Sequence, residues 1–229
     1  MYKIDVICLT DTYDNSMYEV TNRVIKSVRI SEKNVKFNII LLESNKETNF
    51  TYENVDVYIR PEEEFNYNKY LNIANEYLTS DWVLITNNDV IYQREWFSKI
   101  LEIYNKRPDI ESFSPKEVLF YSTIYGDHFD SEDDYFESYR VTESVMGWSL
   151  VMRKRVWDEI YPWDENFDFY YQDNDYAKTI ESKGIKHAVV RDSLTLHIGN
   201  INFFKSNVDE DRDKKMEEDY YKFIKKWNN

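Results

Sequence analysis

Short apolar runs alternate with helix-like patterns along the first part of the chain. Each run ends abruptly at polar residues, as a buried strand does. Between the runs, apolar residues recur at helical spacing, and Ser16 with Glu19 has the spacing of a capping box, which predicts that the first helix begins at Ser16. This alternation indicates parallel βαβ units with right-handed crossovers. The predicted strands of this part are 3–9, 36–42, 55–59 and 82–86, and the second helix is 67–78.

The second part of the chain continues the alternation less regularly. Residues 120–139 are rich in acidic and aromatic side chains and lack a clean period, which predicts a long loop or an irregular hairpin. A functional segment and a variable surface insertion are equal alternatives here. The pattern at 208–227 combines an apolar stripe with many charges, which favours a solvated helix that caps the domain. The other predicted elements are helices 94–104 and about 173–182, the latter ended by Gly184, and strands 110–114, 186–190 and 195–199.

Polar residues follow the predicted parallel strands at the point where each strand ends. They are Thr10 and Asp11, Glu43, Arg60, and the run Asn87-Asn88-Asp89. Because the carboxyl ends of such strands meet at one edge of the sheet, where open α/β sheets bind ligands, we expect these residues to lie together. The carboxylate of Asp89 beside two amides suits a hard divalent cation. A simple turn is the alternative, since Asn and Asp tolerate turn geometry.

Composition favours one folded α/β domain. The chain has 229 residues, of which 42% are hydrophobic, with 20 Tyr, 13 Phe and 6 Trp, and this is ample for a packed core. With only 4 Gly and 4 Pro it has no stretch that resembles a linker.

The charge balance narrows the possible partners. The net charge is −14, which disfavours broad binding to nucleic acid. The single cysteine, Cys8, cannot form an internal disulfide, and its place in an apolar run predicts a buried thiol. The sequence shows neither a leader pattern nor an apolar run of membrane-spanning length, so we expect a cytoplasmic protein without a transmembrane segment.

Four segments occur in a recognisable order. They are Thr10-Asp11-Thr12-Tyr13; residues 65–74 followed by Trp82-Val83-Leu84-Ile85-Thr86-Asn87-Asn88-Asp89; residues 147–153; and residues 169–176 followed by Gly184 and His197-Ile198-Gly199. Together they resemble the motifs of GT-A-type glycosyltransferases, most closely the large inverting family usually numbered two. The resemblance implies a single-domain, Rossmann-like α/β fold with a mixed, mainly parallel sheet flanked by helices. It also implies a strand at 147–153, together with a nucleotide-binding half (1–92), an acceptor and catalytic half (93–206) and a C-terminal helix (207–229).

The same resemblance implies a set of site residues. Asp89 is the expected ligand of a divalent metal, Mn²⁺ or Mg²⁺, and His197 is a second ligand, with a core histidine as the alternative. Asp173 is the expected general base for an acceptor hydroxyl, carbohydrate or other; an N-cap role is the alternative, and Asp175 could be the cap or the base instead. The expected contacts of the nucleotide-sugar donor, a UDP-sugar by preference, are Thr10, Asp11, Glu43, Arg60, Lys69, Asn88 and Trp148. Lys69 could instead be an ordinary solvated lysine. Trp148, Tyr170 and Tyr171 could stack on a sugar ring or, alternatively, pack in the core.

Two departures from the family pattern keep other functions open. Asn87 replaces the first Asp of the Asp-x-Asp metal motif, and Gln172 replaces the Glu before Asp173. A nucleotide- or carbohydrate-binding protein with impaired catalysis is therefore an alternative. A nucleotidyltransferase normally carries a Gly-rich phosphate loop after its first strand, and no Gly occurs in that position here. A glucosyltransferase that modifies DNA is disfavoured by the acidic balance.

Overall fold

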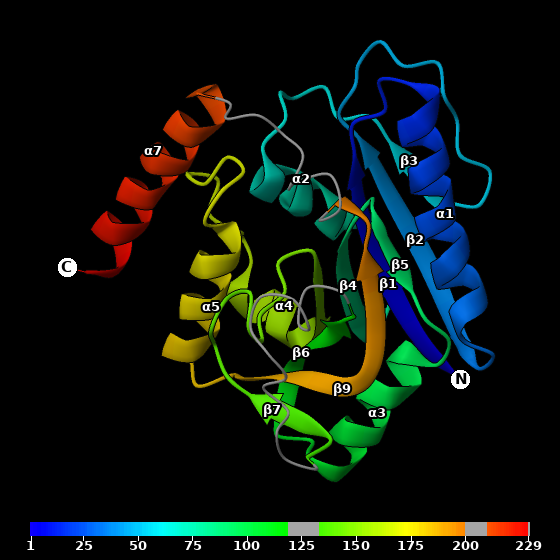
Figure 1. Ribbon diagram of the computed structural model, residues 1–229, viewed down its shortest axis with the longest axis vertical. Coiled ribbons are helices and arrows are strands. Elements are labelled where there is room, and N and C mark those ends of the chain that lie inside the picture. The colour runs from blue at the N-terminus through cyan, green and yellow to red at the C-terminus, as the bar shows by residue number, and fades with distance from the viewer. Residues whose placement is uncertain (119–132, 200–209, 229) are drawn as a thin grey trace.

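One mixed sheet runs through the whole protein. The computed structural model describes residues 1–118, 133–199 and 210–228. Within these residues the sheet has nine strands in the order β3-β2-β1-β4-β8-β6-β9-β5, and β7 pairs with β9 (Figure 1). The strands are β1 (Tyr2–Thr10), β2 (Val35–Glu43), β3 (Val57–Ile59), β4 (Trp82–Asn87), β5 (Val90–Tyr92), β6 (Ile110–Glu117), β7 (Tyr135–Glu137), β8 (Ser149–Arg153) and β9 (Lys186–His197).

The direction of the strands changes at β8. Strands β1 to β4 are mutually parallel, whereas β8 runs antiparallel to both β4 and β6. The edge strands β5 and β7 each pair antiparallel with β9. The prediction of a mixed α/β sheet flanked by helices is confirmed.

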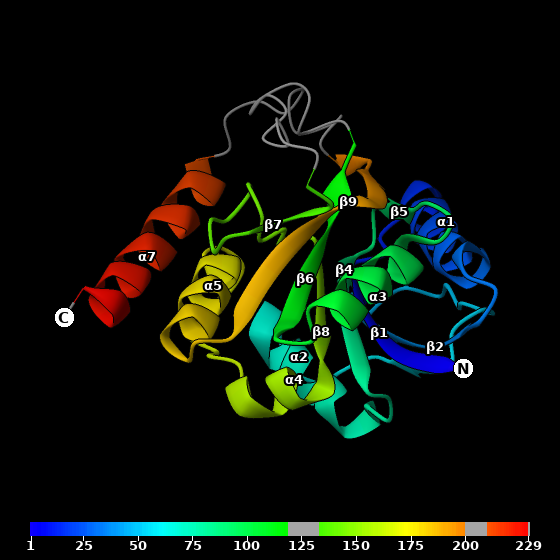
Figure 2. The ribbon, with the colours of Figure 1, turned by 90° about the horizontal axis from the view of Figure 1, so that it is seen from below.

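Helices cover both faces of the sheet because the central strands are apolar on both faces. In β4, Trp82 and Leu84 pack into one core with α1 and α3, whereas Val83 and Ile85 pack into a second core with α2, α4 and α5. This is the alternation of a strand buried on both sides. Helix α7 lies beside α5 at the margin of the molecule (Figures 1 and 2). The helices are α1 (Asn15–Ser31), α2 (Tyr67–Ala74), α3 (Trp96–Lys106), α4 (Lys154–Ile160), α5 (Gln172–Ser182) and α7 (Glu210–Trp227), and a 3₁₀ turn, η1 (Asn75–Tyr77), follows α2.

Several predicted boundaries were wrong. The strand expected at 147–153 from the resemblance begins only at Ser149, because the preceding residues form a turn. The two strands predicted at 186–190 and 195–199 are one continuous strand, β9. The segment 119–132, most of the predicted long loop, lies outside the described residues, and β7 occupies part of the remainder. Strand β5 and helix α4 were not predicted.

The first helix has a different cap from the predicted one. Asp14, not Ser16, is the N-cap of α1, and its carboxylate accepts the backbone N–H of Met17 at 2.8 Å. The capping-box prediction at Ser16 is therefore wrong. Asp14 can cap the helix because its own backbone is extended, whereas Ser16 already lies inside the first turn.

The cap gives a first testable prediction. We expect Asp14→Ala to lower the free energy of unfolding by about 1 kcal/mol, because it leaves an N–H of the first turn without its acceptor. Ser16→Ala is the matched control and should change the free energy by less than about 0.5 kcal/mol, as surface substitutions usually do. Urea denaturation of both variants measures this, and a larger loss for Ser16→Ala would contradict the assignment.

Candidate active site

A pocket of about 830 Å³ lies at the carboxyl ends of β1 and β4. Its wall is completed by the turn before β8, by the segment that leads into α5 and by the end of β9. It contains Asp89, Asp173 and His197, three residues that are far apart in the sequence. A second pocket, of about 690 Å³, lies along α5 and contains neither Asp89 nor Asp173.

Asp89 and His197 are brought together by strand pairing. Asp89 lies in the turn between β4 and β5, and β5 pairs with the end of β9 so that Val90 is opposite His197. The backbone N–H of Ile198 also donates to the carbonyl of Asp89 at 2.8 Å. As a result, Nε2 of His197 lies 3.1 Å from Oδ1 of Asp89.

This pair has the properties of metal ligands. Asp89 Oδ1 lies close to His197 Nε2, but the contact lacks the geometry of a hydrogen bond. Asp89 Oδ1 and His197 Nδ1 are both buried, and neither has a hydrogen-bond partner among the described residues. Buried polar atoms of this kind normally have partners. The described residues contain no group of three or more His, Cys, Asp or Glu that could hold a metal. A divalent cation at this pair would therefore complete its coordination with phosphate oxygens and water.

Gly199 and the indole of Trp148 shape the surroundings of Asp89 and His197. A Cβ atom added to Gly199 would lie 2.0 Å from Oδ2 of Asp89, so no larger residue fits there while Asp89 keeps this position. The indole of Trp148 stacks on the imidazole of His197, with ring centroids 5.1 Å apart and an interplanar angle of 23°. Trp148 lines the pocket, and one face of its ring orients His197.

Asp173 lies in the first turn of α5 and faces the pocket. Its Oδ1 accepts the backbone N–H of Asn174 at 2.8 Å, and no Lys or Arg of the described residues forms an ion pair with it. Burial raises the pKa of the Asp173 carboxyl above its ordinary value. A half-buried carboxylate that faces a pocket, has no cation partner among the described residues and has a raised pKa is suited to accept a proton.

Asp175 does not share this position. Its carboxylate forms an ion pair with Lys226 at 2.8 Å and accepts the indole N–H of Trp227 at 2.7 Å, both from α7. It does not line the pocket, and the N-cap of α5 is Tyr171, which makes no side-chain capping bond. The alternative in which Asp175 is the cap is therefore wrong, and its ion pair with Lys226 favours Asp173 over Asp175 as the base.

Four of the expected donor contacts line the pocket, namely Thr10, Asp11, Asn88 and Trp148. Thr10, Asp11 and Asn88 come from the ends of β1 and β4. The amide of Asn88 donates to the hydroxyls of Thr10 at 3.0 Å and Thr21 at 3.1 Å, which fixes the turn that carries Asp89. Asp11 is exposed at the pocket, so its carboxylate can meet a ligand.

Three other expected contacts do not line the pocket. Glu43 is fully buried and accepts the backbone N–H groups of Thr12 at 3.0 Å and Asn45 at 2.9 Å. Arg60 donates to the carbonyl of Thr48 at 2.9 Å, and Nζ of Lys69 lies 3.9 Å from the carboxylate of Glu165. The structure thus gives these side chains partners within the protein, and their expected contact with the donor stays a prediction.

The pocket also contains residues that the sequence did not single out as contacts. Gln172 lines it, and its side-chain oxygen is buried without a hydrogen-bond partner among the described residues. Phe65, Tyr67 and Phe169 add aromatic surface beside Tyr170 and Tyr171. Tyr67 could not be recognised because it belongs to the apolar pattern of its helix.

Gly147 allows the turn before β8 to approach Asp173. A Cβ atom added there would lie 2.6 Å from Oδ2 of Asp173. We expect Gly147→Ala to displace this carboxylate and to lower kcat roughly 100-fold, the scale of a misplaced catalytic group. The control is Gly147→Ala in an Asp173→Asn background. There it should lower kcat little further, because both changes act through the carboxylate of Asp173. Equal losses in both backgrounds would contradict this interpretation.

The topology and the position of the pocket define a GT-A fold. A solved structure confirms it: the crystal structure of GalNAc-T7 with UDP, GalNAc and Mn²⁺ matches with a TM-score of 0.66 over 85% of this chain and 43% of that chain, at 12% identity. The chain therefore spans less than half the length of that protein, and at this identity the match concerns the fold alone. No family model matches the sequence, and no curated protein matches it. No helix among residues 1–118, 133–199 and 210–228 is both long and apolar enough to cross a membrane.

Proposed function

We propose that this protein is a metal-assisted, inverting glycosyltransferase, related to the family that its motifs resemble. It transfers a sugar from a nucleotide-sugar, a UDP-sugar by preference, to an acceptor hydroxyl. The observation that carries the proposal is that Asp89 and Asp173 line one pocket at the carboxyl ends of β1 and β4. The GalNAc-T7 structure, which contains UDP and Mn²⁺ on the same fold, supports the choice of donor and metal.

Asp89 and His197 would hold the metal. When bound there, Mn²⁺ or Mg²⁺ stabilises the negative charge that develops on the leaving diphosphate. Asn87, which replaces the first carboxylate of the metal motif, lines the pocket, and its backbone N–H donates to the carbonyl of Trp148 at 3.0 Å. In the run Asn87-Asn88-Asp89, Asp89 is therefore the single carboxylate. It would supply the negative charge that this turn offers to a bound cation.

Asp173 acts as the general base. As the acceptor oxygen bonds to the anomeric carbon, the bond to the diphosphate breaks and the hydroxyl proton passes to Asp173. The neighbouring Gln172 is neutral, so the raised pKa of Asp173 comes from burial and not from an adjacent carboxylate. The replacement of Glu by Gln is therefore compatible with catalysis.

The raised pKa of Asp173 predicts a pH dependence. The base works only when deprotonated, so kcat should fall as the pH is lowered through its pKa, and this acidic limb should lie above the range of an ordinary Asp. The same shift affects stability, because burial favours the protonated carboxyl of Asp173 in the folded state. Its contribution to the free energy of unfolding is fully present below the pKa of the unfolded state. It is lost as the pH rises through the raised pKa of the folded state. A pH profile of kcat checks this. An acidic limb at the ordinary Asp value would contradict it.

A panel of nucleotide-sugars tests the function. UDP- and GDP-sugars are incubated with the protein and Mn²⁺ or Mg²⁺, and the released nucleoside diphosphate is measured, with a chelator as the control. We expect metal-dependent release from at least one donor. Binding of UDP and Mn²⁺ without release from any donor would favour the alternative of a binding protein with impaired catalysis, which Asn87 and Gln172 keep open.

A further inference from the structure

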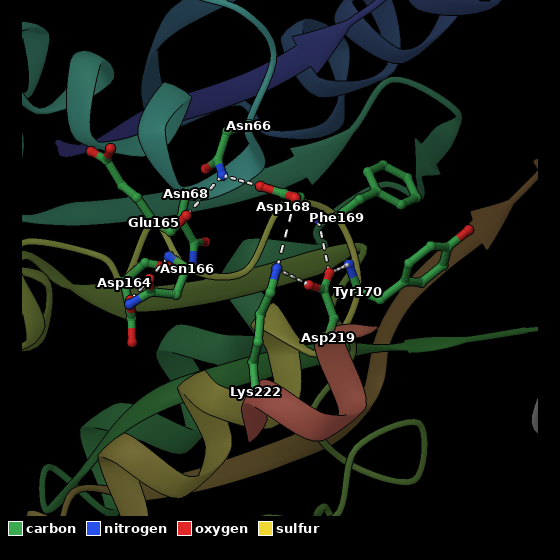
Figure 3. Close-up of polar contacts among 10 residues, drawn as sticks. All are labelled: Asn66, Asn68, Asp164, Glu165, Asn166, Asp168, Phe169, Tyr170, Asp219 and Lys222. Carbon is green, nitrogen blue, oxygen red and sulfur yellow. Dashed lines mark hydrogen bonds and ion pairs between the residues drawn. The ribbon is translucent and has the colours of Figure 1, made fainter. Parts of the chain in front are cut away.

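The segment that leads into α5 is held from two sides. This segment, residues 164–171, is called the base-side loop here, and it carries Phe169, Tyr170 and Tyr171 into the pocket wall. From α2, the side-chain amide of Asn66 donates to Asp168 at 2.9 Å and to the carbonyl of Glu165 at 3.0 Å. Figure 3 shows the loop between these asparagine contacts and side chains of α7.

The contact from α7 depends on one buried carboxylate. Asp219 is only 2% exposed, although it belongs to a highly charged helix. Its Oδ2 accepts a hydrogen bond from the backbone N–H of Tyr170 at 3.1 Å and a longer one from that of Phe169 at 3.5 Å. Its Oδ1 accepts a hydrogen bond from the Lys222 ammonium at 2.7 Å (Figure 3). Both oxygens therefore have partners, as a buried carboxylate requires.

Other side chains of α7 reach the same region. Lys226 bridges Asp164 at 2.7 Å and Asp175 at 2.8 Å. The ring of Tyr171 lies 5.6 Å from that of Tyr220 and 5.5 Å from that of Phe223. Helix α7 thus holds the base-side loop and the first turn of α5 together, which a helix that merely caps the domain would not do.

The loop needs such support at its last residue. Tyr171 has φ 61°, a left-handed conformation that is unfavourable for a residue other than Gly. It lies between Tyr170, which Asp219 holds through its backbone N–H, and Asp173 in the first turn of α5. The direction of Asp173 therefore depends on the backbone that Asp219 fixes.

We propose that Asp219 is a positioning residue, which holds the backbone of Phe169 and Tyr170 so that Tyr171 and Asp173 keep their places in the pocket wall. The inference rests on the proposed function, because it assigns Asp219 to the same reaction. Asp219 itself does not line the pocket and touches no reacting group.

The test compares Asp219→Asn with Glu218→Gln. The first variant keeps the shape of the side chain but has only one acceptor oxygen. It can no longer accept from both the backbone N–H groups of the loop and the Lys222 ammonium, so the hold on the loop weakens. The second neutralises the exposed carboxylate next to it. With the UDP-sugar that the wild type hydrolyses fastest, we expect Asp219→Asn to lower kcat roughly 10- to 100-fold with the donor KM unchanged. We also expect it to move the acidic limb of the pH profile and to speed hydrogen exchange at the amides of Phe169 and Tyr170, but not in β4.

The outcomes separate the two proposals. If the wild type hydrolyses no donor, the proposed function fails and the role of Asp219 in it fails as well. If the wild type is active and Asp219→Asn has the same kcat and pH profile as Glu218→Gln, only the positioning role is overturned. The positioning role is also overturned if Asp219→Asn loses UDP binding in parallel with kcat. Should Asp219→Asn not fold, Lys222→Met decides: a loss of kcat with donor KM kept supports the role, and wild-type kinetics overturn it.

Discussion

Replacement of Asp173 by Asn is expected to lower kcat by roughly 100- to 10,000-fold, the range that a general base contributes. The amide has nearly the same shape but cannot take the acceptor proton. Because burial raises the pKa of this carboxyl and no Lys or Arg of the described residues pairs with it, the substitution should leave the free energy of unfolding at neutral pH unchanged or increased. Binding of UDP with Mn²⁺ should persist, since Asp89 and His197 are untouched.

The measurement is the rate of release of UDP from the donor, with thermal stabilisation by UDP and Mn²⁺ as the binding assay. Asp158→Asn is the matched control, because it makes the same chemical change at an exposed position on α4. A rate for Asp173→Asn close to that of the control would remove Asp173 from the mechanism. The acidic limb of the pH profile should also disappear in Asp173→Asn.

Asp89→Ala is expected to abolish the Mn²⁺-dependent stabilisation by UDP. A ligand at 100 times its Kd stabilises the folded state by about 2.7 kcal/mol. For a protein of this size each kcal/mol corresponds to roughly 2–4 °C in Tm. Without Asp89, His197 is the only member of the pair left to bind the cation, and the shift should vanish.

Asp81→Ala provides the matched control for this experiment. Asp81 is an exposed aspartate immediately before β4, at the end of the strand opposite to the pocket. Its variant should keep the full shift in Tm. If Asp89→Ala retains the dependence on Mn²⁺, or if Asp81→Ala loses it, the metal site has been assigned to the wrong residues.

The central part of the fold could be predicted because its strands are apolar on both faces. The run from Trp82 to Ile85 is fully buried, and its uninterrupted apolar character, ended by polar residues, indicated a strand inside a covered sheet. The missed elements, β5 and α4, are short, and β5 is held by a pairing distant in sequence, that with β9. Local patterns carry little information about such pairings.

The candidate site was predictable in position but not in every side chain. A residue at the end of a parallel strand lies near the pocket, yet its side chain can turn into the neighbouring loop, as Glu43 does when it accepts the N–H groups of Thr12 and Asn45. The contribution of α7 could not be predicted, because charged residues on an amphipathic helix usually face solvent. Only the structure shows that Asp219 is buried against the base-side loop.

The most direct test of the account is a crystal of the protein with UDP and Mn²⁺, in which the anomalous signal of manganese locates the metal. The account predicts one manganese peak within coordination distance of Asp89 and His197, with the diphosphate bound to it and Asp173 facing the open side of the same pocket. A manganese peak elsewhere, or UDP bound outside this pocket, would contradict it.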